Sequence, residues 1–435
     1  MSRVLSLSIK PKGPLADNGN NGDIDSNRLI DKITVLPQNT NRVSTIQSIN
    51  IETLLGDCMD INIDRLTNEF CALAGMDSPS FGEKEVCDYL KRQLIELGFS
   101  VAEDQAGTGH ENGCGNLYGY LNGEETLGAP LLLCAHMDTV EPSQGKRAVI
   151  SEDGRITSAG DTVLGADDIS GMTAILEALR VIDENGIRHR PIEVLFTVAE
   201  EVYCGGASQF DFSQIRSKQA YVLDLSGPIG TAAFCAPSIL FFTATVTGKS
   251  AHAGFEPKKG VHAIAAAADA VSKLKLGHIG EEATLNIGVI QGGRATNIVP
   301  DECIVRGEAR SFSHHKALEL VETVKQQFND SAAAIGASAA FEVTEGCKAY
   351  ETPVDHPVAD RFRNVCKSME IEAKLIKTFG GSDNNYLAAH GITGLVAASG
   401  MHDCHTCAEY TTVEELAQSA RLVASLIVSD DGAEA

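Results

Sequence analysis

Residues 131–138 read Leu-Leu-Leu-Cys-Ala-His-Met-Asp, so a short apolar run leads directly into a histidine and an aspartate. A continuous apolar run of this length predicts a buried strand. Because residues two apart on an extended strand share a face, Asp138 can reach the ring nitrogen of His136 that a metal ion does not use. A carboxylate in that position fixes the orientation of a metal-binding imidazole. We therefore expect a buried strand that ends in a metal ligand.

Two further apolar runs also end in acidic residues. Residues 192–198 precede Glu200 and Glu201, and residues 220–223 precede Asp224. Each feature has an ordinary explanation, since a glutamate pair is usually part of a solvated loop and an aspartate after a strand is often a turn residue. In α/β sheets, however, functional groups gather beyond the ends of neighbouring strands. Three such strands in one chain therefore predict a two-metal hydrolase.

The segment 164–168, Leu-Gly-Ala-Asp-Asp, adds two more acids, Asp167 and Asp168. This turn could simply begin a helix, with Asp168 or Ser170 as its cap. Apolar residues recur at helical spacing through residues 171–182, which predicts a helix packed on the sheet. The alternation of strand, helix and strand implies an α/β fold with a mostly parallel, mixed sheet flanked by helices.

In chain order, these motifs resemble those of the M20 family of dinuclear zinc peptidases, and most nearly its peptidase T branch. The likeness extends from about residue 60 to the end of the chain, and the motifs are specific only as a set. The segments that carry it are 136–140, 162–168, 197–201, 248–254, 297–301, 380–383 and 405–409. The resemblance implies a discontinuous catalytic domain with an inserted α+β domain for substrate closure and dimerisation.

The resemblance also implies a role for each candidate residue. The implied metal ligands are His136, Asp167, Glu201, Asp224 and His405. Asp167 would bridge two Zn²⁺ ions in each subunit, and Co²⁺ or Mn²⁺ could substitute for zinc. Glu200 would be the general base, while Asp138 would orient His136. The implied activity is that of a tripeptidase-like aminopeptidase that acts on short peptides. The alternative is an M20-type amidohydrolase or deacetylase that cleaves N-acyl amino acids or another non-peptide amide.

The chain departs from the family pattern at two places. Where relatives usually carry Lys-Ala-Gly after the paired aspartates, residues 169–171 read Ile-Ser-Gly, which removes a positive charge beside Asp167. Residues 202–206, which follow the two glutamates, are also atypical at their start. Neither departure touches an implied metal ligand. The metal chemistry is therefore expected to remain, while substrate preference stays open.

His405 lies within the sequence Cys-His-Thr-Cys at residues 404–407. A Cys-x-x-Cys pair often marks a structural zinc site or a redox dithiol, to which His402 could add a ligand. A structural zinc site needs two more ligands at similar spacing, and the sequence holds no second Cys-x-x-Cys pair. The pattern therefore favours His405 as a ligand of the catalytic metals.

The composition is that of an acidic protein, with 59 acidic and 35 basic residues and a formal net charge of −24. This charge argues against nucleic acid as a partner, because nucleic acids require a basic surface. The 12 cysteines are scattered and follow no signal peptide, so they are expected to be reduced thiols in the cytoplasm. No apolar stretch reaches transmembrane length, and we expect no membrane partner.

The sequence divides into three parts. Residues 1–50 are polar and lack hydrophobic periodicity, so a disordered extension is expected there. Residues 51–236 together with 352–435 would form the zinc-binding catalytic domain, which includes helices at about 63–75 and 82–98. Residues 237–351 would form the inserted lid and dimerisation domain. The elements expected in this insert are strands at 240–247 and 303–310 and helices at about 260–275 and 315–330.

The insert carries its own candidate residues. Arg310 shares a strand face with other charged residues, so it could be part of a surface salt bridge, and the resemblance instead favours contact with a substrate carboxylate. The resemblance implies that His252 stabilises the oxyanion, often from the partner subunit of a homodimer, and that Asn297 is a second polar substrate contact. The turn at 380–383 could approach the substrate backbone or could be a plain helix start with Ser382 as cap.

Overall fold

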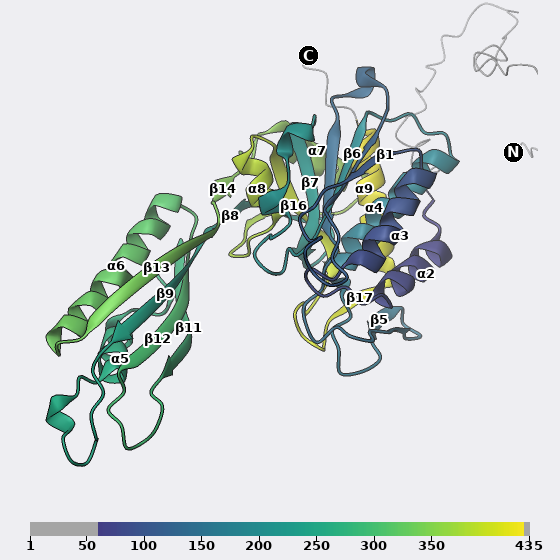
Figure 1. The fold of residues 1–435 in the computed structure, drawn as a ribbon. Coiled ribbons are helices and arrows are strands. Elements are labelled where there is room, and N and C mark those ends of the chain that lie inside the picture. The colour runs from purple at the N-terminus through teal and green to yellow at the C-terminus, as the bar shows by residue number, and fades with distance from the viewer. Residues whose placement is uncertain (1–59, 430–435) are drawn as a thin grey trace, which may run out of the picture. The chain divides into compact units, whose positions relative to one another are not determined.

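A computed structural model describes residues 60–429, which are drawn in colour in Figure 1. The extension expected at residues 1–50 lies outside the described residues. Within the described range, no helix combines the length and the apolar character needed to cross a membrane.

The largest sheet in the described residues is a mixed sheet of nine strands. Its four central strands, β6, β3, β7 and β16, run parallel to one another, and antiparallel strands flank them on both sides. The order across the sheet is β1 (Ser100–Glu103), β2 (Leu117–Leu121), β6 (Ile192–Thr197), β3 (Leu131–His136), β7 (Gln219–Ser226), β16 (Thr393–Met401), β8 (Thr231–Ala236) and β14 (Tyr350–Glu351), with β15 (Lys374–Lys377) paired to β8. The predicted α/β fold is therefore confirmed.

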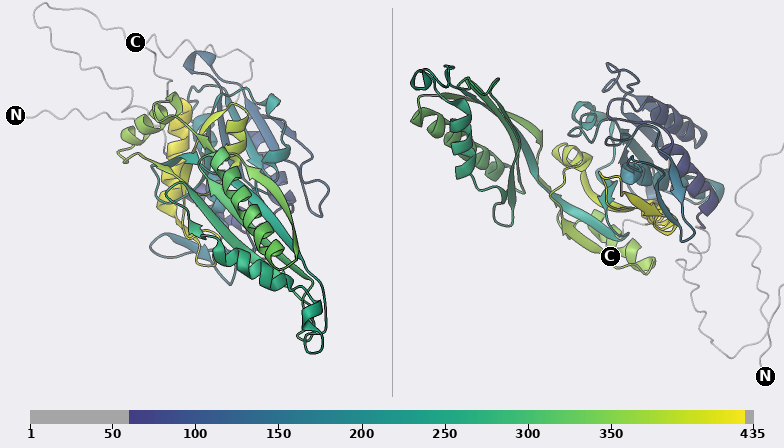
Figure 2. Two further views of the ribbon diagram at one scale, coloured as in Figure 1. Left: turned by 90° about the vertical axis from the view of Figure 1, so that its left-hand side faces the viewer. Right: turned by 90° about the horizontal axis from the view of Figure 1, so that it is seen from below.

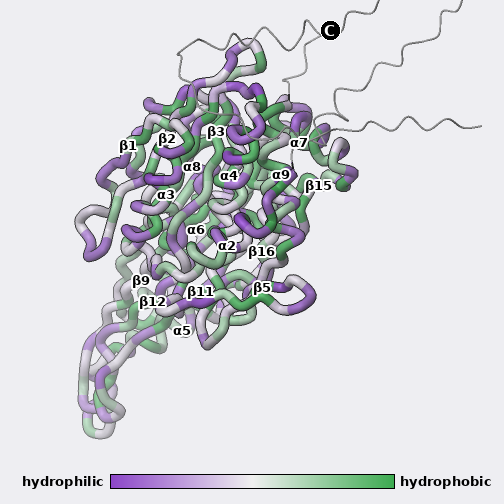
Figure 3. Tube along the Cα trace, turned by 90° about the vertical axis from the view of Figure 1, so that its right-hand side faces the viewer, coloured by the Kyte–Doolittle hydropathy of each residue, from purple (hydrophilic) through white to green (hydrophobic). Residues whose placement is uncertain are grey.

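The central strands are buried on both faces, as a parallel sheet requires. Every residue of β3 and of β6 is buried. In β3, Leu131, Leu133 and Ala135 belong to one hydrophobic core, whereas Leu132 and Cys134 belong to the core on the other face. Full burial of one such leucine contributes about 1.5–3 kcal/mol. The continuous apolar run in the sequence thus follows from two-sided burial, and Figure 3 shows hydrophobic residues running through this part of the chain.

Helices cover both faces of this sheet. The larger core is shared with α2 (Ile63–Ala74), α3 (Lys84–Glu96), α4 (Ala166–Glu184), α7 (Pro357–Ser368) and α9 (Val413–Val428). The other core is shared with α8 (Asp383–Ala389) and the short 3₁₀ helices η3 (Ala207–Gln209) and η4 (Phe212–Gln214). A further 3₁₀ helix, η2, spans Glu125–Leu127. The helices predicted near 63–75, 82–98 and 171–182 are thus present as α2, α3 and α4.

Side-chain caps fix where several of these helices begin. Asn62 Oδ1 accepts the backbone N–H of Arg65 at the start of α2 (3.0 Å). Thr412 Oγ1 accepts the N–H of Glu415 at the start of α9 (3.1 Å). Short polar side chains suit this position because the first N–H groups of a helix have no partner within the helix.

A second, five-stranded antiparallel sheet is formed by residues that lie between β8 and β14 in the sequence. Its order is β10 (Gly277–His278), β11 (Ala283–Gly292), β12 (Glu302–Ser311), β9 (Ser238–Thr247) and β13 (Ser338–Cys347). Helices α5 (Ala263–Lys273) and α6 (His314–Ala334) share a core with one face of this sheet (Figures 1 and 2). Alternate residues of β9 are buried, which explains the period-two pattern of its sequence. The two strands and two helices predicted here are present, and the 3₁₀ helix η5 spans Pro257–Lys259.

A small third sheet pairs β17 (Tyr410–Thr412) with β5 (Arg155–Ser158) and β5 with β4 (Ala148–Ile150). It fixes the end of the loop between β16 and β17, which carries His405. Arg155 also places its guanidinium 3.5 Å from the ring centroid of Tyr410, a favourable cation–π contact.

Candidate active site

Acidic and histidine side chains converge beyond the carboxyl ends of the parallel strands. His136 is the last residue of β3, Glu200 and Glu201 follow β6, and Asp224 lies near the end of β7. Asp167 lies at the non-helical start of α4. His405 reaches the same place from the loop after β16, with its backbone in the left-handed region (φ 64°). Neighbouring parallel strands end at one edge of the sheet, and this arrangement brings residues from distant parts of the sequence together.

Asp167 lies between the two histidines. Its Oδ1 is 3.0 Å from Nε2 of His136, and its Oδ2 is 3.2 Å from Nε2 of His405. His405 Nε2 is also 3.1 Å from Oε1 of Glu201, and His136 Nε2 is 3.8 Å from Oδ1 of Asp224. One carboxylate therefore presents one oxygen to each of two nitrogen-and-oxygen donor sets.

The donor chemistry fits a pair of divalent cations. Among residues 60–429, three groups have ligand atoms within 4.8 Å of one another: His136 with Asp167 and Glu201, His136 with Glu200 and Asp224, and Glu200 with Cys204 and Asp383. Imidazole nitrogen and carboxylate oxygen are the ligands that zinc takes in catalytic sites. A carboxylate with one oxygen toward each histidine has the geometry that a bridging ligand needs. The described residues thus contain candidate ligands for a dinuclear centre.

The electrostatics of the cluster also call for added positive charge. Burial raises the pKa of the Asp224 carboxyl, and the neighbouring Glu200 and Asp167 raise it further. Hydrogen bonds with Asp167 and Glu201 raise the pKa of His405 to about 10. Burial opposes ionisation of Asp167, but its hydrogen bonds with His136 and His405 outweigh burial and lower its pKa. Protons on the histidines compensate the carboxylates here, and divalent cations can take over that role.

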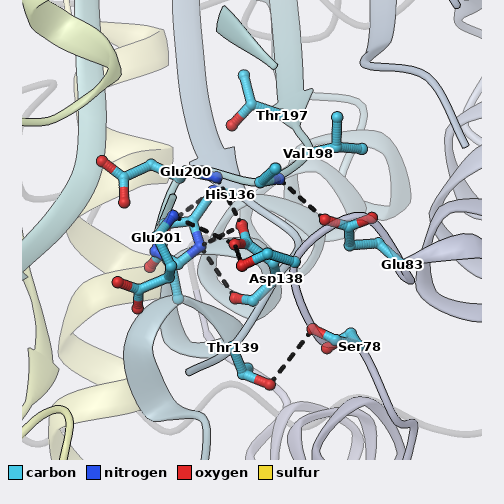
Figure 4. Close-up of polar contacts among 12 residues, drawn as sticks. Ser78, Glu83, His136, Asp138, Thr139, Thr197, Val198, Glu200 and Glu201 are labelled. Carbon is cyan, nitrogen blue, oxygen red and sulfur yellow. Dashed lines mark hydrogen bonds and ion pairs between the residues drawn. The ribbon is translucent and has the colours of Figure 1, made fainter. Parts of the chain in front are cut away.

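Asp138 supports the cluster from behind. Its Oδ1 lies 3.3 Å from Nδ1 of His136, the ring nitrogen that faces away from Asp167. The same carboxylate accepts the backbone N–H groups of Glu200 (2.8 Å) and Glu201 (3.2 Å) and the hydroxyl of Ser80 (2.6 Å). Figure 4 shows Asp138 linked by dashed lines to the histidine and to the two glutamates. Nδ1 of His136 is also 3.0 Å from the backbone oxygen of Asp138, so this residue holds the imidazole through its backbone and its carboxylate, and the glutamate turn through its carboxylate.

Two further carboxylates, Glu409 and Asp168, support the cluster through hydrogen bonds, a role that the sequence did not indicate. Glu409 accepts the backbone N–H groups of Gly165 (2.6 Å) and Asp167 (2.9 Å), so it fixes the turn that presents Asp167. Asp168 accepts the N–H of Gly171 (3.1 Å), as the capping alternative anticipates, and also the N–H of His136 (3.2 Å). Both acids lie within the sequence motifs given above, but no other feature of the sequence indicates that they support the cluster.

Lys146 supplies a buried positive charge near this turn. Its Nζ donates to Oγ1 of Thr139 (2.9 Å). Burial lowers the pKa of Lys146 to about 8, although Asp77, Glu409 and Glu141 act in the opposite direction. This lysine comes from a different segment than the one that Ile169 occupies, where the family pattern has its lysine.

A cavity of about 380 Å³ opens beside the cluster. Glu200, Glu201 and Asp224 line it together with Asp167 and His405. Its remaining wall is largely apolar and includes Tyr203, Leu225, Ile239, Phe241, Cys347, Val396 and Met401. A volume of this order accommodates a small ligand. The rings of Tyr203 and Phe241 contact each other at a centroid distance of 4.0 Å, so residues of the glutamate loop and of β9 share this wall.

Arg310 lines the same cavity and is held in place by neighbours. It pairs with Glu308 through Nε (2.8 Å) and Nη2 (3.1 Å), and Nη1 donates to the backbone oxygen of Phe379 (2.8 Å). A guanidinium has five N–H groups. These three bonds leave two N–H groups for a ligand, so the salt bridge and a substrate contact are compatible.

His252 and Asn297 lie elsewhere in the described chain and do not line the cavity. The His252 ring accepts the N–H groups of Gly254 and Phe255 (both 3.1 Å), and the backbone oxygen of Asn297 accepts the N–H of Ala253 (2.9 Å). Both residues are solvent-exposed. Within one chain, the structure therefore does not bring these two candidates to the metal-ligand cluster.

The cysteines around His405 do not form a metal-ligand group of their own in residues 60–429. Cys404 lines the cavity, whereas the thiol of Cys407 donates to the backbone oxygen of Asp161 (3.5 Å). His402 lies 2.8 Å from Oε1 of Glu415 through its Nε2 and so has a partner outside the cluster. This arrangement disfavours a structural zinc site at residues 404–407.

The turn at 380–383 lies both at the cavity and at the start of a helix. Gly380, Gly381 and Ser382 line the cavity, and Ser382 occupies the N-cap position of α8, which begins at Asp383. The backbone N–H of Ser382 donates to Oδ1 of Asn385 (3.0 Å). The helix start therefore forms part of the cavity wall.

A family model described as peptidase family M20/M25/M40 matches residues 132–429 of the chain. The protein belongs to this family. That match covers β3, the glutamate turn, the second sheet and the His405 loop, and it confirms the resemblance found in the sequence. The M20 peptidase therefore carries its candidate metal ligands in the part of the chain that defines the family.

Solved structures agree with this assignment. A tripeptidase from Staphylococcus aureus is similar to the M20 peptidase at 34% identity and a TM-score of 0.81, covering 84% of this chain and 98% of that one. The aminopeptidase PepT from Bacillus cereus is similar at 38% identity and a TM-score of 0.78, covering 85% and 98%. The uncharacterized protein YqjE of Bacillus subtilis is 38% identical over 369 residues, which is 84% of this chain and 98% of that protein.

Proposed function

We propose that this M20 peptidase is a dinuclear zinc aminopeptidase that removes the N-terminal residue from short peptides. The observation that carries the proposal is the position of Asp167, with one carboxylate oxygen toward each of two histidines at the edge of a cavity. The likeness to a tripeptidase and to an aminopeptidase at 34% and 38% identity favours short peptides with a free amino end.

In this proposal two zinc ions would be held by Asp167 together with His136 and Asp224 for one ion and with Glu201 and His405 for the other. When bound, the metal ions would lower the pKa of the attacking water and polarise the scissile carbonyl. Support comes from the distances of 3.0–3.8 Å that already link these side chains to the two histidines.

Glu200 is proposed as the general base. It takes the proton of the attacking water and passes it to the leaving amine. Its carboxylate lines the cavity and accepts a hydrogen bond from the thiol of Cys204 (3.3 Å). Asp138 holds the N–H groups of both Glu200 and Glu201, so adjacent side chains can point in different directions from one fixed turn.

The remaining wall of the cavity is proposed to bind the peptide. Two N–H groups of Arg310 are available for the substrate carboxylate, a geometry that a planar guanidinium suits. The apolar residues opposite the acids would contact substrate side chains.

We also propose that residues 51–236 with 352–435 act as the catalytic domain and residues 237–351 as the lid. His252 and Asn297 do not line the cavity of their own chain, and we propose that a substrate contact by either comes from a second copy in a homodimer. The cysteines of the described chain are free thiols, which supports action in the reducing cytoplasm.

The test combines metal content with activity. Zinc per subunit is measured by elemental analysis, and cleavage of an unblocked tripeptide is followed before chelation, after chelation and after zinc is restored. About two equivalents of zinc per subunit, with activity lost and regained, are expected. N-blocked tripeptides and N-acyl amino acids serve as matched substrates. Turnover of N-acyl substrates alone would refute the aminopeptidase and favour the amidohydrolase alternative.

A further inference from the structure

Four consecutive backbone N–H groups, at residues 198–201, donate to buried side chains from other parts of the chain. Val198 donates to Asn116 Oδ1 (3.1 Å), Ala199 to Glu83 Oε1 (2.9 Å), and Glu200 and Glu201 to Asp138 (2.8 and 3.2 Å). Strand β6 ends at Thr197, so no sheet partner fixes this segment. The backbone oxygens of residues 198–200 accept N–H groups from residues 204–206 (2.7–2.9 Å), whereas the N–H groups of the turn are held by side chains, two of which, Glu83 and Asp138, are labelled in Figure 4.

Glu83 is the least expected of these acceptors. It is fully buried and lies at the start of α3, yet its carboxylate makes no capping bond to that helix. Its Oε1 instead accepts the N–H groups of Phe81 (2.7 Å) and Ala199 (2.9 Å). Burying a carboxylate is costly unless its hydrogen bonds compensate, so this use of Glu83 calls for an explanation.

The two donors share an unusual backbone. Phe81 and Ala199 both adopt positive φ angles, 65° and 52°. Non-glycine residues rarely adopt this conformation, and surrounding contacts must maintain it. One oxygen of Glu83 therefore ties together two left-handed residues, one of which immediately precedes Glu200. Loss of that oxygen would leave the Ala199 N–H without its acceptor while its carbonyl still accepts the N–H of Gly205 (2.7 Å), so we expect Glu200 and Glu201 to shift relative to His136 without unfolding of the turn.

We propose that Glu83 is a positioning residue that sets the geometry of Glu200 and Glu201 through the N–H of Ala199. It acts through the backbone and touches neither substrate nor metal. The inference rests on the proposed function, because it takes Glu200 as the base and Glu201 as a metal ligand. Partners of this kind, one step removed from a metal centre, affect metal affinity or activity by about 10–100-fold when they are mutated.

Three variants at this position separate the acceptor from the charge. Glu83→Ala removes the acceptor, and Glu83→Asp keeps the charge but withdraws it by one methylene. Glu83→Gln keeps an oxygen at Oε1 and places its amide nitrogen at Oε2, which has no hydrogen-bond partner in the described chain. We expect the alanine and aspartate variants to lose about 10–100-fold in kcat with little change in KM, and the glutamine variant to stay within about threefold.

Metal affinity provides a readout that needs no substrate. In zinc titrations of metal-free protein, Glu83→Ala is expected to weaken one of the two equivalents by about tenfold or more, and Glu83→Gln to restore it. Glu193→Ala is the matched control. Glu193 is also a fully buried glutamate that accepts two backbone N–H groups, from Arg216 (2.9 Å) and Ser217 (2.7 Å), but it holds no part of the glutamate turn. Its loss should lower the unfolding temperature and leave kcat and zinc affinity unchanged.

The outcomes distinguish this inference from the proposed function. A wild-type protein that binds zinc and cleaves peptides, with Glu83→Ala and Glu83→Asp matching it in kcat and zinc affinity, overturns the inference alone. Equal losses in the glutamine and alanine variants also overturn it, because charge rather than acceptor position would then matter. If Glu83→Ala fails to fold, the aspartate and glutamine pair gives the same comparison. A wild-type protein that binds no zinc overturns both proposals.

Discussion

Replacement of Asp138 by asparagine is expected to damage the site more than its small change in shape suggests. The carboxylate is fully buried and accepts three hydrogen bonds, from Glu200 N, Glu201 N and the Ser80 hydroxyl. The two backbone donors use different oxygens, Oδ1 for Glu200 and Oδ2 for Glu201. Because asparagine has one oxygen, either orientation of its amide leaves an NH₂ group facing one of these N–H donors.

The magnitude follows from that count. A hydrogen bond to a charged group contributes about 1.5–3 kcal/mol, and a buried donor left without a partner costs about 1–3 kcal/mol. These contributions overlap, so we expect Asp138→Asn to lose about 2–4 kcal/mol of unfolding free energy. The glutamate turn would lose one of its two acceptors, and the His136 ring would keep the backbone oxygen of Asp138 (3.0 Å) but lose the charged carboxylate beside it. A loss of about 10–100-fold in kcat or zinc affinity is therefore expected as well.

The assay compares Asp138→Asn with Ser80→Ala. The serine variant removes one hydrogen bond to the same carboxylate, and because Ser80 is only half-buried it should cost about 1.5 kcal/mol, the low end of that range, and leave zinc affinity nearly unchanged. Unfolding is followed in urea, zinc affinity by titration, and kcat at saturating zinc. If Asp138→Asn loses stability but keeps wild-type zinc affinity and kcat, the link between this carboxylate and the site is refuted. If it loses no more stability than Ser80→Ala, the count of hydrogen bonds is wrong.

Three further predictions concern other parts of the site. Glu200→Ala should keep its metal and lose on the order of 10²–10⁴-fold in turnover, and full activity would mean that another group carries the proton. Arg310→Ala should raise KM about 10–100-fold for tripeptides with a free carboxyl end but not for their amides, because charge-assisted bidentate bonds are lost; equal effects on both substrates would rule out this contact. Burial lowers the pKa of Lys146 from 10.5 to about 8, so between these values the unfolded chain binds more protons and stability rises with pH. The free energy of unfolding of Lys146→Met should therefore exceed that of the wild type by about 3 kcal/mol at pH 7, and urea unfolding at several pH values should show this advantage fading by about pH 10.5.

Much of the fold could be predicted because its signals are local. Two-sided burial gives β3 its continuous apolar run, and one-sided burial gives β9 its alternating pattern. Helix α4 is visible from apolar residues at helical spacing. The antiparallel strands that flank the parallel centre were not predicted in detail. Their pairing depends on which sheet edges remain open once the central strands have assembled, and a single strand's sequence carries little information about that.

The candidate site divides in a similar way. The sequence marks the donors, since His136, Asp167, Glu200 and Asp224 each follow a strand or turn in a recognisable motif. It also leaves His252 as a candidate, although the structure of one chain keeps that residue outside the cavity. Placement relative to the cavity depends on how the second sheet and the nine-stranded sheet contribute to its wall, which no local pattern expresses.

By itself, the sequence determined which residues are candidates for metal ligands and base, because these roles need particular residue types next to particular strand ends. Only the tertiary structure decided what holds them in place. Glu83 and Ala199 are 116 positions apart, and Glu409 and Asp167 are 242 apart, yet each pair is joined by a hydrogen bond of 2.9 Å. A bond of that length requires the whole chain to bring donor and acceptor together, and the spacing of residues along the sequence carries no record of it.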